Sequence, residues 1–285
     1  MASDPKDISK DIPKDRPADA PKDGPLPAQP AGWGLLWLDL RLGFAFLTRL
    51  PVAGAGDQPE RKLAEAAWTF PVVGVVVGLA SGVGLWVGLW LGFDPLASAL
   101  LGVAASIAVT GALHEDGLAD VADGFGGGAD KGAKLRIMRD SRIGTYGVLA
   151  LLIGVGLRVT LVAGMIGPGT AVLALVAAGV LSRALLPVMM HVLPPARRSG
   201  LAAAAGRPER GDVALTLLLG VGATLGLLGV GPGIAALLAA ASAYVAIHET
   251  ARRQIGGHTG DVLGALQQAV EIFVLASVAT ATVML

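Results

Sequence analysis

The sequence predicts an all-α protein, a polytopic transmembrane helical bundle of six to seven spans with a disordered N-terminal tail. Of its 285 residues, 53% are apolar and only 15% are charged, whereas soluble domains carry about 25% charged residues. The apolar residues fall into runs of about 20, the length that a helix needs to cross a bilayer. Between these runs, Lys and Arg gather on alternate loops, as they do in multi-pass membrane proteins.

The chain divides by composition into a polar tail, residues 1–32, and an integral membrane domain, residues 33–285. Residues 5–24 repeat in steps of four, beginning with PKDI. Proline disfavours helix, and the alternating Lys and Asp have nothing apolar to bury, so we expect this tail to be disordered. No apolar core of a secretion signal occurs before about Trp33.

The first apolar segment, residues 33–50, carries charges close to its middle, at Asp39, Arg41 and Arg49. Such charges make a membrane span costly. We therefore expect a helix that lies in the membrane interface, with its tryptophans near the lipid headgroups.

Seven further apolar runs are candidate spans. They cover residues 70–93, 96–113, 147–167, 170–193, 213–231, 234–247 and 262–285. The sixth run is short and is divided from the fifth by Pro232, so the two form either separate spans or one re-entrant pair. Six or seven spans result.

The charged loops predict the orientation of these spans. The loops after the second, fourth and sixth runs contain Lys131, Lys134, Arg136, Arg139 and Arg142, then Arg197, Arg198, Arg207 and Arg210, then Arg252 and Arg253. The opposite loops, GFDP, GPG and GPG, contain no Lys or Arg. By the positive-inside rule, every long polar loop is cytoplasmic, so we expect any chemistry at that surface.

Composition also excludes several functions. The formal net charge is zero, which gives no indication of a nucleic-acid partner. The absence of Cys excludes disulfides, zinc–thiolate sites and a thiol nucleophile. The sequence contains no P-loop, G-x-S-x-G elbow or H-E-x-x-H motif.

The stretch HEDGLADVADGFGGG, residues 114–128, follows the second run and is rich in acid. On a helix, Asp116, Asp120 and Asp123 share one face, because they are spaced by four and three residues. Their mutual repulsion would be relieved by a divalent cation such as Mg²⁺ or Mn²⁺. The alternative is a solvated acidic helix end. His114 points roughly away from this face, so a direct place among the metal ligands is not expected.

A basic stretch, residues 131–147, lies on the same predicted side. Arg guanidinium groups match phosphate oxygens in pairs, so Arg139 and Arg142 are candidate phosphate ligands, while Lys131 and Lys134 are explained by topology alone. Acid beside base predicts a site at which a metal bridges a phosphate ester.

Three charges fall inside predicted spans: Arg158, Arg183 and Glu271. Buried charges in a bilayer are costly unless paired. They indicate either a polar cavity in the bundle or structural ion pairs. Near the last span, Asp261 is explained by helix capping or by a functional role.

Three stretches resemble the cobalamin synthase (adenosylcobinamide-GDP ribazoletransferase) family. They are GALHEDGLADVADGF, IMRDSRIGTYGV and GGHTGDVLGA, at residues 111–125, 137–148 and 256–265. The resemblance covers roughly residue 33 to the end. Arg139 stands where the family is expected to have Lys, and Glu115 and His258 stand at variable positions.

The resemblance implies a multi-pass enzyme of the bacterial inner membrane with cytoplasmic active-site loops, in contact with lipid and dependent on Mg²⁺. Such enzymes join α-ribazole, or its 5′-phosphate, to GDP-activated adenosylcobinamide and release GMP, late in cobalamin synthesis.

The resemblance also suggests roles for individual residues. Asp116 and Asp120 would hold Mg²⁺, with Asp123 as a further ligand or as the base, and Asp140 and Asp261 would orient the attacking hydroxyl. The expected substrate-binding residues are His114, Arg139, Ser141, Arg142, Thr145 and Arg183.

Two other functions are compatible with a membrane protein of this kind. A CDP-alcohol phosphatidyltransferase-like enzyme also uses clustered aspartates, but its D-x-x-D-G-x-x-A-R pattern is absent after Asp120. A cation-coupled transporter would place its acidic residues near the bilayer midplane, whereas most of the acidic residues here are predicted at one surface.

Overall fold

The computed structural model describes residues 32–52, 61–165, 167–197 and 200–283. Helices and their connections account for these residues, with one isolated backbone bridge between Pro195 and His258. The predicted all-α class is therefore confirmed. The predicted disordered tail lies, apart from residue 32, outside the described residues.

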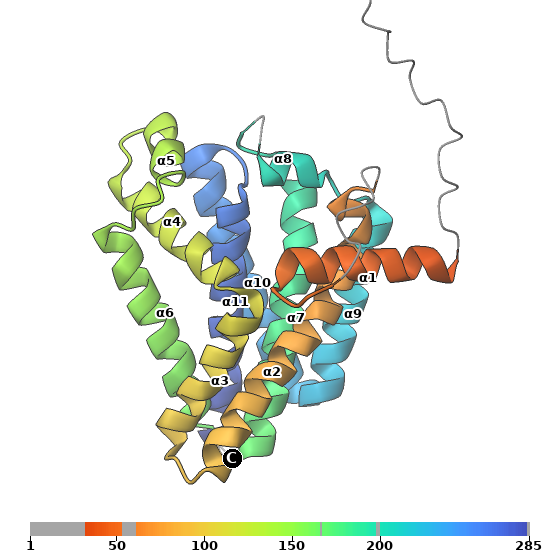
Figure 1. Ribbon diagram of the computed structural model, residues 1–285, viewed down its shortest axis with the longest axis vertical. Coiled ribbons are helices and arrows are strands. Elements are labelled where there is room, and N and C mark those ends of the chain that lie inside the picture. Colours follow the sequence, from red (N-terminus) through yellow and green to blue (C-terminus); the bar gives the residue numbers. More distant parts are fainter. Residues whose placement is uncertain (1–31, 53–60, 166, 198–199, 284–285) are drawn as a thin grey trace, which may run out of the picture.

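The helices follow one another with short connections (Figure 1). Their bounds are α1 Trp33–Leu47, the 3-10 helix η1 Leu63–Thr69, α2 Phe70–Trp90, α3 Pro95–Thr110, α4 Leu113–Gly127, α5 Lys131–Ile137, α6 Thr145–Ala163, α7 Pro168–Val192, α8 Leu201–Ala205, α9 Arg210–Leu228, α10 Val230–Ile255 and α11 Gly260–Val283.

Within the described ranges, six helices are long and apolar enough to cross a membrane: α2 with η1, α6, α7, α9, α10 and α11. Helices α3 and α4 form a bent pair that makes a seventh span if counted as one. This confirms the predicted six to seven spans.

The expectation of a short sixth span, or of a re-entrant pair, was wrong. Helices α9 and α10 are both full-length, and α10 has 26 residues. Pro232 does not divide the two helices, because it lies in the first turn of α10, where a missing N–H breaks no helical hydrogen bond. At its other end, α10 continues through Glu249, which pairs with Arg252 and Arg253.

The predicted second span is interrupted before the acidic stretch. Helix α3 ends at Thr110, and the chain turns through Gly111 and Ala112, which have φ values of 64° and 59°. Helix α4 then leaves at 91° to α3. The acidic residues therefore lie on a separate helix, rather than on the end of a continuous span.

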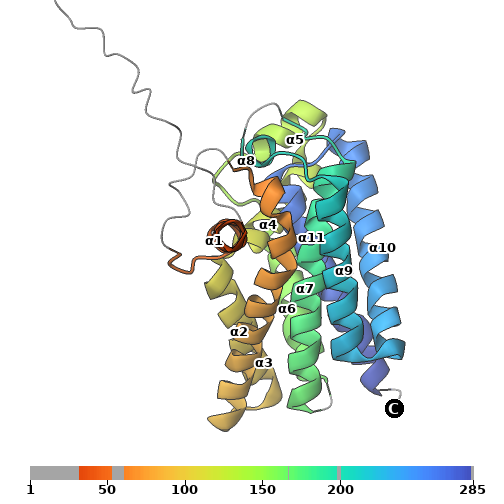
Figure 2. The ribbon, with the colours of Figure 1, turned by 90° about the vertical axis from the view of Figure 1, so that its right-hand side faces the viewer.

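Helix α7 forms the centre of the bundle and packs against α2, α9 and α11 (Figures 1 and 2). Glycine permits the closest of these contacts. A Cβ atom on Gly74 of α2 would lie 2.7 Å from the Cα atom of Val180 in α7, so the two backbones touch directly, as is common for small residues in membrane helix pairs.

Helix α1 runs across the other helices rather than along them (Figures 1 and 2). Its Asp39 is 2% exposed and pairs with Arg61 at 2.8 Å and with the Trp68 indole at 2.9 Å. Trp33 and Trp37 remain exposed. Asp39, the charge that argued against a span, thus attaches α1 to η1. The location of α1 in the membrane interface stays a prediction.

The polar connections gather at one end of the bundle. Helices α5 and α8 and the link between α10 and α11 lie together there, opposite the turns that join α2 to α3 and α9 to α10 (Figures 1 and 2). This segregation matches the loop partition expected from the positive charges.

Candidate functional site

The candidate site lies where α4 packs against α11. The two helices meet through glycines: a Cβ atom on Gly117 would lie 2.8 Å from the carbonyl oxygen of Asp261, and one on Gly264 would lie 3.1 Å from that of His114. Because no side chain separates the backbones, Asp116 and Asp261 reach the wall of one cavity.

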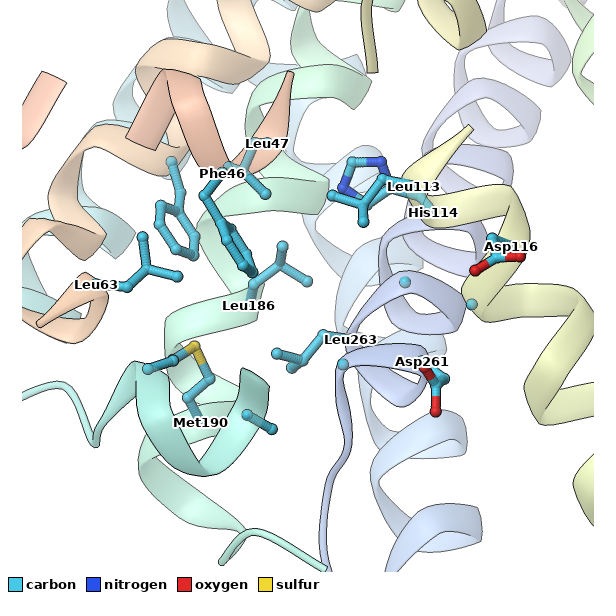
Figure 3. A pocket seen from close by; sticks show the side chains of 16 residues that line it. Phe46, Leu47, Leu63, Leu113, His114, Asp116, Leu186, Met190, Asp261 and Leu263 are labelled. Carbon is cyan, nitrogen blue, oxygen red and sulfur yellow. The ribbon is translucent and has the colours of Figure 1, made fainter. Parts of the chain in front are cut away.

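This apolar cavity has a volume of about 160 Å³. Three of its sixteen lining residues carry polar side chains, namely His114, Asp116 and Asp261. Figure 3 shows both aspartates at one end, while Phe46 and Met190 lie toward the other. The cavity therefore has an acidic end and an apolar interior.

Asp120 lies one helical turn beyond Asp116 and is half-buried. The charges of Asp116, Asp261 and Asp123 act against its negative charge, and that of Arg197 acts in its favour. Negative charge thus exceeds positive charge at this end of the cavity.

Arg197 reaches the acidic group through a backbone contact between distant segments. The N–H of Ala196 donates to the carbonyl of His258 at 2.8 Å, and the N–H of His258 donates to that of Pro194 at 2.9 Å. These bonds bring the segment after α7 beside the start of α11. The sequence indicated only a topological role for Arg197, and no local motif distinguishes it from the other loop arginines.

A second, polar cavity of about 140 Å³ adjoins the first and shares Asp261 with it. Arg197 and His258 line it. The Nε atom of Arg197 and the Nδ1 atom of His258 are buried and have no hydrogen-bond partner among the described residues. The unpaired Nε–H of Arg197 is a donor suited to an anion, whereas Nδ1 of His258 donates or accepts according to the tautomer of its ring.

Burial lowers the pKa of both residues, but it changes the protonation of His258 alone. It lowers the pKa of Arg197, while the charge of Asp261 raises it, and a guanidinium remains charged throughout the physiological range. Burial also lowers the pKa of His258 to about 4, so its ring is neutral near pH 7. The positive charge of this cavity therefore comes from Arg197.

Asp123 points toward α6 and not toward the cavities. Its carboxylate accepts the N–H groups of Gly144 at 2.7 Å and Gly147 at 2.9 Å. These are unpaired donors of the first turn of α6, where a negative charge is stabilised. Asp123 therefore fixes the start of α6, and the predicted Asp triad is divided between two environments.

The part of the chain that the structure describes contains no group of three or more His, Cys, Asp or Glu side chains that could hold a metal ion by themselves. Asp116, Asp120 and Asp123 share one helical face as expected, but they do not converge as a complete ligand set. Asp261, from α11, is the carboxylate that the fold adds beside Asp116.

The connection between α5 and α6 and the first residue of α6 carry five predicted site residues, all of them exposed: Arg139, Asp140, Ser141, Arg142 and Thr145. Arg142 pairs with Asp140 at 2.8 Å, and this guanidinium lowers the pKa of Asp140. Arg139 is close enough to Arg197 for their charges to interact. Of the two predicted phosphate ligands, Arg139 is therefore the one whose charge acts on a residue that lines the polar cavity.

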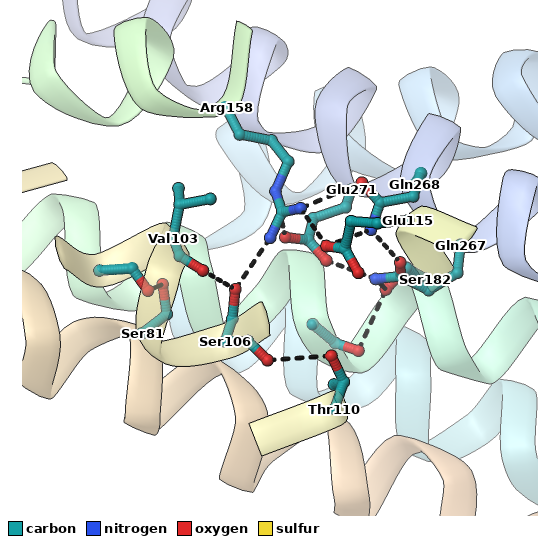
Figure 4. Close-up of polar contacts among 12 residues, drawn as sticks. Ser81, Val103, Ser106, Thr110, Glu115, Arg158, Ser182, Gln267, Gln268 and Glu271 are labelled. Atoms are coloured by element: carbon teal, nitrogen blue, oxygen red, sulfur yellow. Dashed lines mark hydrogen bonds and ion pairs between the residues drawn. The ribbon is translucent and has the colours of Figure 1, made fainter. Parts of the chain in front are cut away.

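The charges predicted inside spans form a packed network (Figure 4). Arg158 pairs with Glu115 at 2.6 Å and with Glu271 at 3.1 Å, and it also donates to Ser106 and Gln268. These contacts join α3, α4, α6 and α11. Gln267 of α11 adds a fifth helix, because it donates to Ser182 of α7.

Arg183 lies in the same region, is 1% exposed and donates to the carbonyl of Gly179. Its charge interacts with Glu271 and Glu115. Arg158 and Glu271 therefore form an ion pair, as in the second of the two alternatives, and Arg183 interacts with the glutamates through its charge. Arg183 does not line either cavity at the candidate site.

Comparison with known proteins points to one family. A family model described as cobalamin-5-phosphate synthase matches residues 39–279. An adenosylcobinamide-GDP ribazoletransferase from Bradyrhizobium diazoefficiens is 44% identical, over 83% of this chain and 91% of its own. Proteins of the same name from Mesorhizobium japonicum and Sinorhizobium medicae are 45% and 42% identical, over 83% and 86% of this chain and 91% and 97% of theirs. No solved structure matches the chain.

Proposed function

This chain belongs to the cobalamin-5-phosphate synthase family, and we infer from that premise that it is an adenosylcobinamide-GDP ribazoletransferase. It acts at the nucleotide-loop assembly step of cobalamin synthesis, as a multi-pass membrane enzyme. The observation that carries this inference is 44% identity to such a transferase over 83% of the chain. We further propose that the enzyme lies in the bacterial inner membrane with α5 and α8 on the cytoplasmic side.

The proposed reaction is a phosphoryl-group transfer. A ribose hydroxyl of α-ribazole, or of its 5′-phosphate, attacks the phosphorus atom that is joined to cobinamide. A new P–O bond forms, the P–O bond to GMP breaks, and the hydroxyl loses its proton. Such a transfer needs an oriented hydroxyl, a proton acceptor and cations around the phosphates.

Asp261 is suited to orient the hydroxyl and accept its proton, because it lies in the walls of both cavities. The hydroxyl of Thr259 donates to its carboxylate at 3.1 Å, which limits the rotation of the side chain. Asp123 is less suited to act as the base, since both of its oxygens accept backbone N–H groups.

The carboxylates at the site are hard oxygen donors, the kind that Mg²⁺ prefers. Protein Mg²⁺ sites use one or two carboxylates and complete the shell with substrate phosphates and water, so a full protein cage is not required. We propose that Asp116 and Asp120 would hold Mg²⁺, which would neutralise charge on the diphosphate.

Arg197 and Arg139 are the proposed phosphate ligands from the protein. Arg197 offers a buried guanidinium nitrogen without a partner among the described residues, and Arg139 lies within range of its charge. Together they would hold the GDP phosphates over the polar cavity, next to the hydroxyl that Asp261 orients.

Purified full-length protein tests the proposal. We expect GMP release only when adenosylcobinamide-GDP, α-ribazole and Mg²⁺ are all present. Asp120→Asn should lower kcat by about 100-fold or more, the usual loss when one electrostatic contact to the transition state is removed. Asp94→Asn is the matched control, because Asp94 caps α3 at the opposite end and Asn caps helices equally well. Full activity and unchanged Mg²⁺ dependence in Asp120→Asn would refute the metal assignment.

A further inference from the structure

We propose that the apolar cavity binds the aromatic base of the ribazole acceptor and so determines which lower base the enzyme accepts. This inference rests on the proposed function and names a subsite within it. The α-ribazole molecule has two unlike ends, a flat apolar benzimidazole and a ribose that carries the attacking hydroxyl. The cavity likewise has an apolar part, which would hold the benzimidazole, and an acidic end, which would face the ribose.

The walls of the cavity are suited to a flat ring. Phe46 of α1, Phe70 of α2, Leu186 and Met190 of α7, and Leu263 of α11 line its apolar part. The rings of Phe46 and Phe70 stack with centroids 6.5 Å apart and planes inclined by 16°. Aromatic rings favour further aromatic partners at such distances, and methionine adapts its shape to them.

The size of the cavity indicates one small aromatic group. Its volume of about 160 Å³ is close to the roughly 150 Å³ of an apolar protein cavity that binds benzene. A bicyclic base requires modest widening beyond this, which the flexible side chain of Met190 can provide. The corrin ring of the other substrate is several times larger and cannot enter.

The acidic end of the cavity places the ribose. Asp116 and Asp261 form this end (Figure 3), so a base packed against the stacked pair of phenylalanines would direct its ribose hydroxyls toward carboxylates. Asp261 also lines the polar cavity with Arg197. Acceptor and donor would thus meet at Asp261, the base in the apolar cavity and the phosphates in the polar one.

Variants that fill the cavity test this assignment. Met190→Trp adds volume from α7, and Ala205→Leu adds it from α8. Met190→Leu, which conserves volume, is the conservative comparison at the same position, and Ala235→Leu, on an exposed face of α10, is the control. Each full-length protein would be assayed for GMP release with the α-ribosides of 5,6-dimethylbenzimidazole and of unsubstituted benzimidazole.

We expect the filled variants to raise the KM for the dimethylbenzimidazole riboside by about tenfold or more, the range for one methyl group in a hydrophobic pocket. The KM for the smaller benzimidazole riboside should rise less, and the KM for adenosylcobinamide-GDP should not change. Ala235→Leu should behave as the wild type, and Met190→Leu should change the KM for both ribosides less than Met190→Trp does.

Three results would overturn the assignment: a rise in the KM for adenosylcobinamide-GDP alone, equal changes for both ribosides, or no change in any KM. The last would indicate that a lipid chain or no ligand occupies the cavity. Wild-type protein that releases no GMP with both substrates would instead refute the proposed function. If Met190→Trp fails to elute as a single species on gel filtration, Ala205→Leu decides the outcome from a different helix.

Discussion

Arg197 and Arg142 illustrate how position, rather than residue type, determines a role at the site. Both are loop arginines on the same end of the bundle. Arg142 lies in a conspicuous motif, but its side chain is 87% exposed and pairs with Asp140. Arg197 has no motif, yet it lines the polar cavity and has a buried nitrogen without a partner among the described residues. The Arg197 guanidinium donates to the carbonyl of Leu135 at 2.7 Å but forms no ion pair among the described residues. It can therefore form stronger bonds to a phosphate than a guanidinium already bound to a carboxylate.

We therefore predict that Arg197→Gln lowers kcat/KM for adenosylcobinamide-GDP by about tenfold to 100-fold, since hydrogen bonds between charged groups contribute about 1.5–3 kcal/mol. Arg142→Gln should have the smaller effect. Steady-state GMP release measures both. A larger loss of kcat/KM in Arg142→Gln than in Arg197→Gln would indicate that the phosphates bind at the α5–α6 connection instead of at Arg197.

Helices α4 and α11 form the element pair on which the site depends. Gly117 and Gly264 let their backbones touch, and this contact brings Asp116 of one helix beside Asp261 of the other. The bend after α3 contributes as well, because it frees α4 to lie against α11 instead of continuing along the bundle.

Adding one methyl group to this contact should therefore affect catalysis. In Gly117→Ala the new Cβ atom would lie 2.8 Å from the carbonyl oxygen of Asp261, so the helices must separate. We expect kcat/KM to fall by up to about 100-fold, which is the effect that a displacement of about 1 Å can have on reacting groups.

Gly156→Ala is the matched control for this substitution, because a Cβ atom on Gly156 of α6 meets no atom within 4 Å. It should keep wild-type activity and gain slightly in stability, since Ala favours helix over Gly. Wild-type kinetics in Gly117→Ala would show that the contact is not needed to align the carboxylates.

The network around Arg158 holds the whole molecule together, because it joins α3, α4, α6, α7 and α11 through polar side chains in an apolar bundle. Two arginines, at 158 and 183, balance two glutamates, at 115 and 271. Removing one member leaves an uncompensated buried charge, which is far more costly than removing a surface charge.

We predict that Arg158→Met lowers the free energy of unfolding by about 3–5 kcal/mol, the usual loss when a buried ion pair is broken. Thermal unfolding in detergent, followed by gel filtration, measures it. Arg252→Met removes an exposed partner of Glu249 and should leave stability unchanged. Equal stability of both variants would mean that the network is not structural.

The orientation of the molecule can be tested directly, because the chain contains no cysteine. Ala129→Cys, between α4 and α5, and Phe93→Cys, between α2 and α3, would each carry the sole thiol. With a membrane-impermeant maleimide, we expect Ala129→Cys to be labelled in inverted vesicles and Phe93→Cys in spheroplasts. The reverse pattern would invert the proposed topology.

The sequence alone determined the class of the protein and much of its architecture. Helical class, six to seven spans and the transverse first helix follow from the lengths of the apolar runs and from charges such as Asp39, because the bilayer imposes a fixed length and a high cost on unpaired charge. The motifs around Asp116, Asp140 and Asp261 indicated the family, since they are local in the chain.

Tertiary structure decided which of these residues meet. Asp123 binds the start of α6 and so points away from the cavity that Asp116 lines. Backbone bonds bring Arg197 beside Asp261, and Arg158 pairs with Glu115 and Glu271. Each of these contacts joins residues from separate segments of the chain. Local patterns describe the face of one helix, whereas these contacts depend on bends and on glycine contacts between helices. The site is formed by that packing, so the residues that meet in it could be known only once the helices were placed against one another.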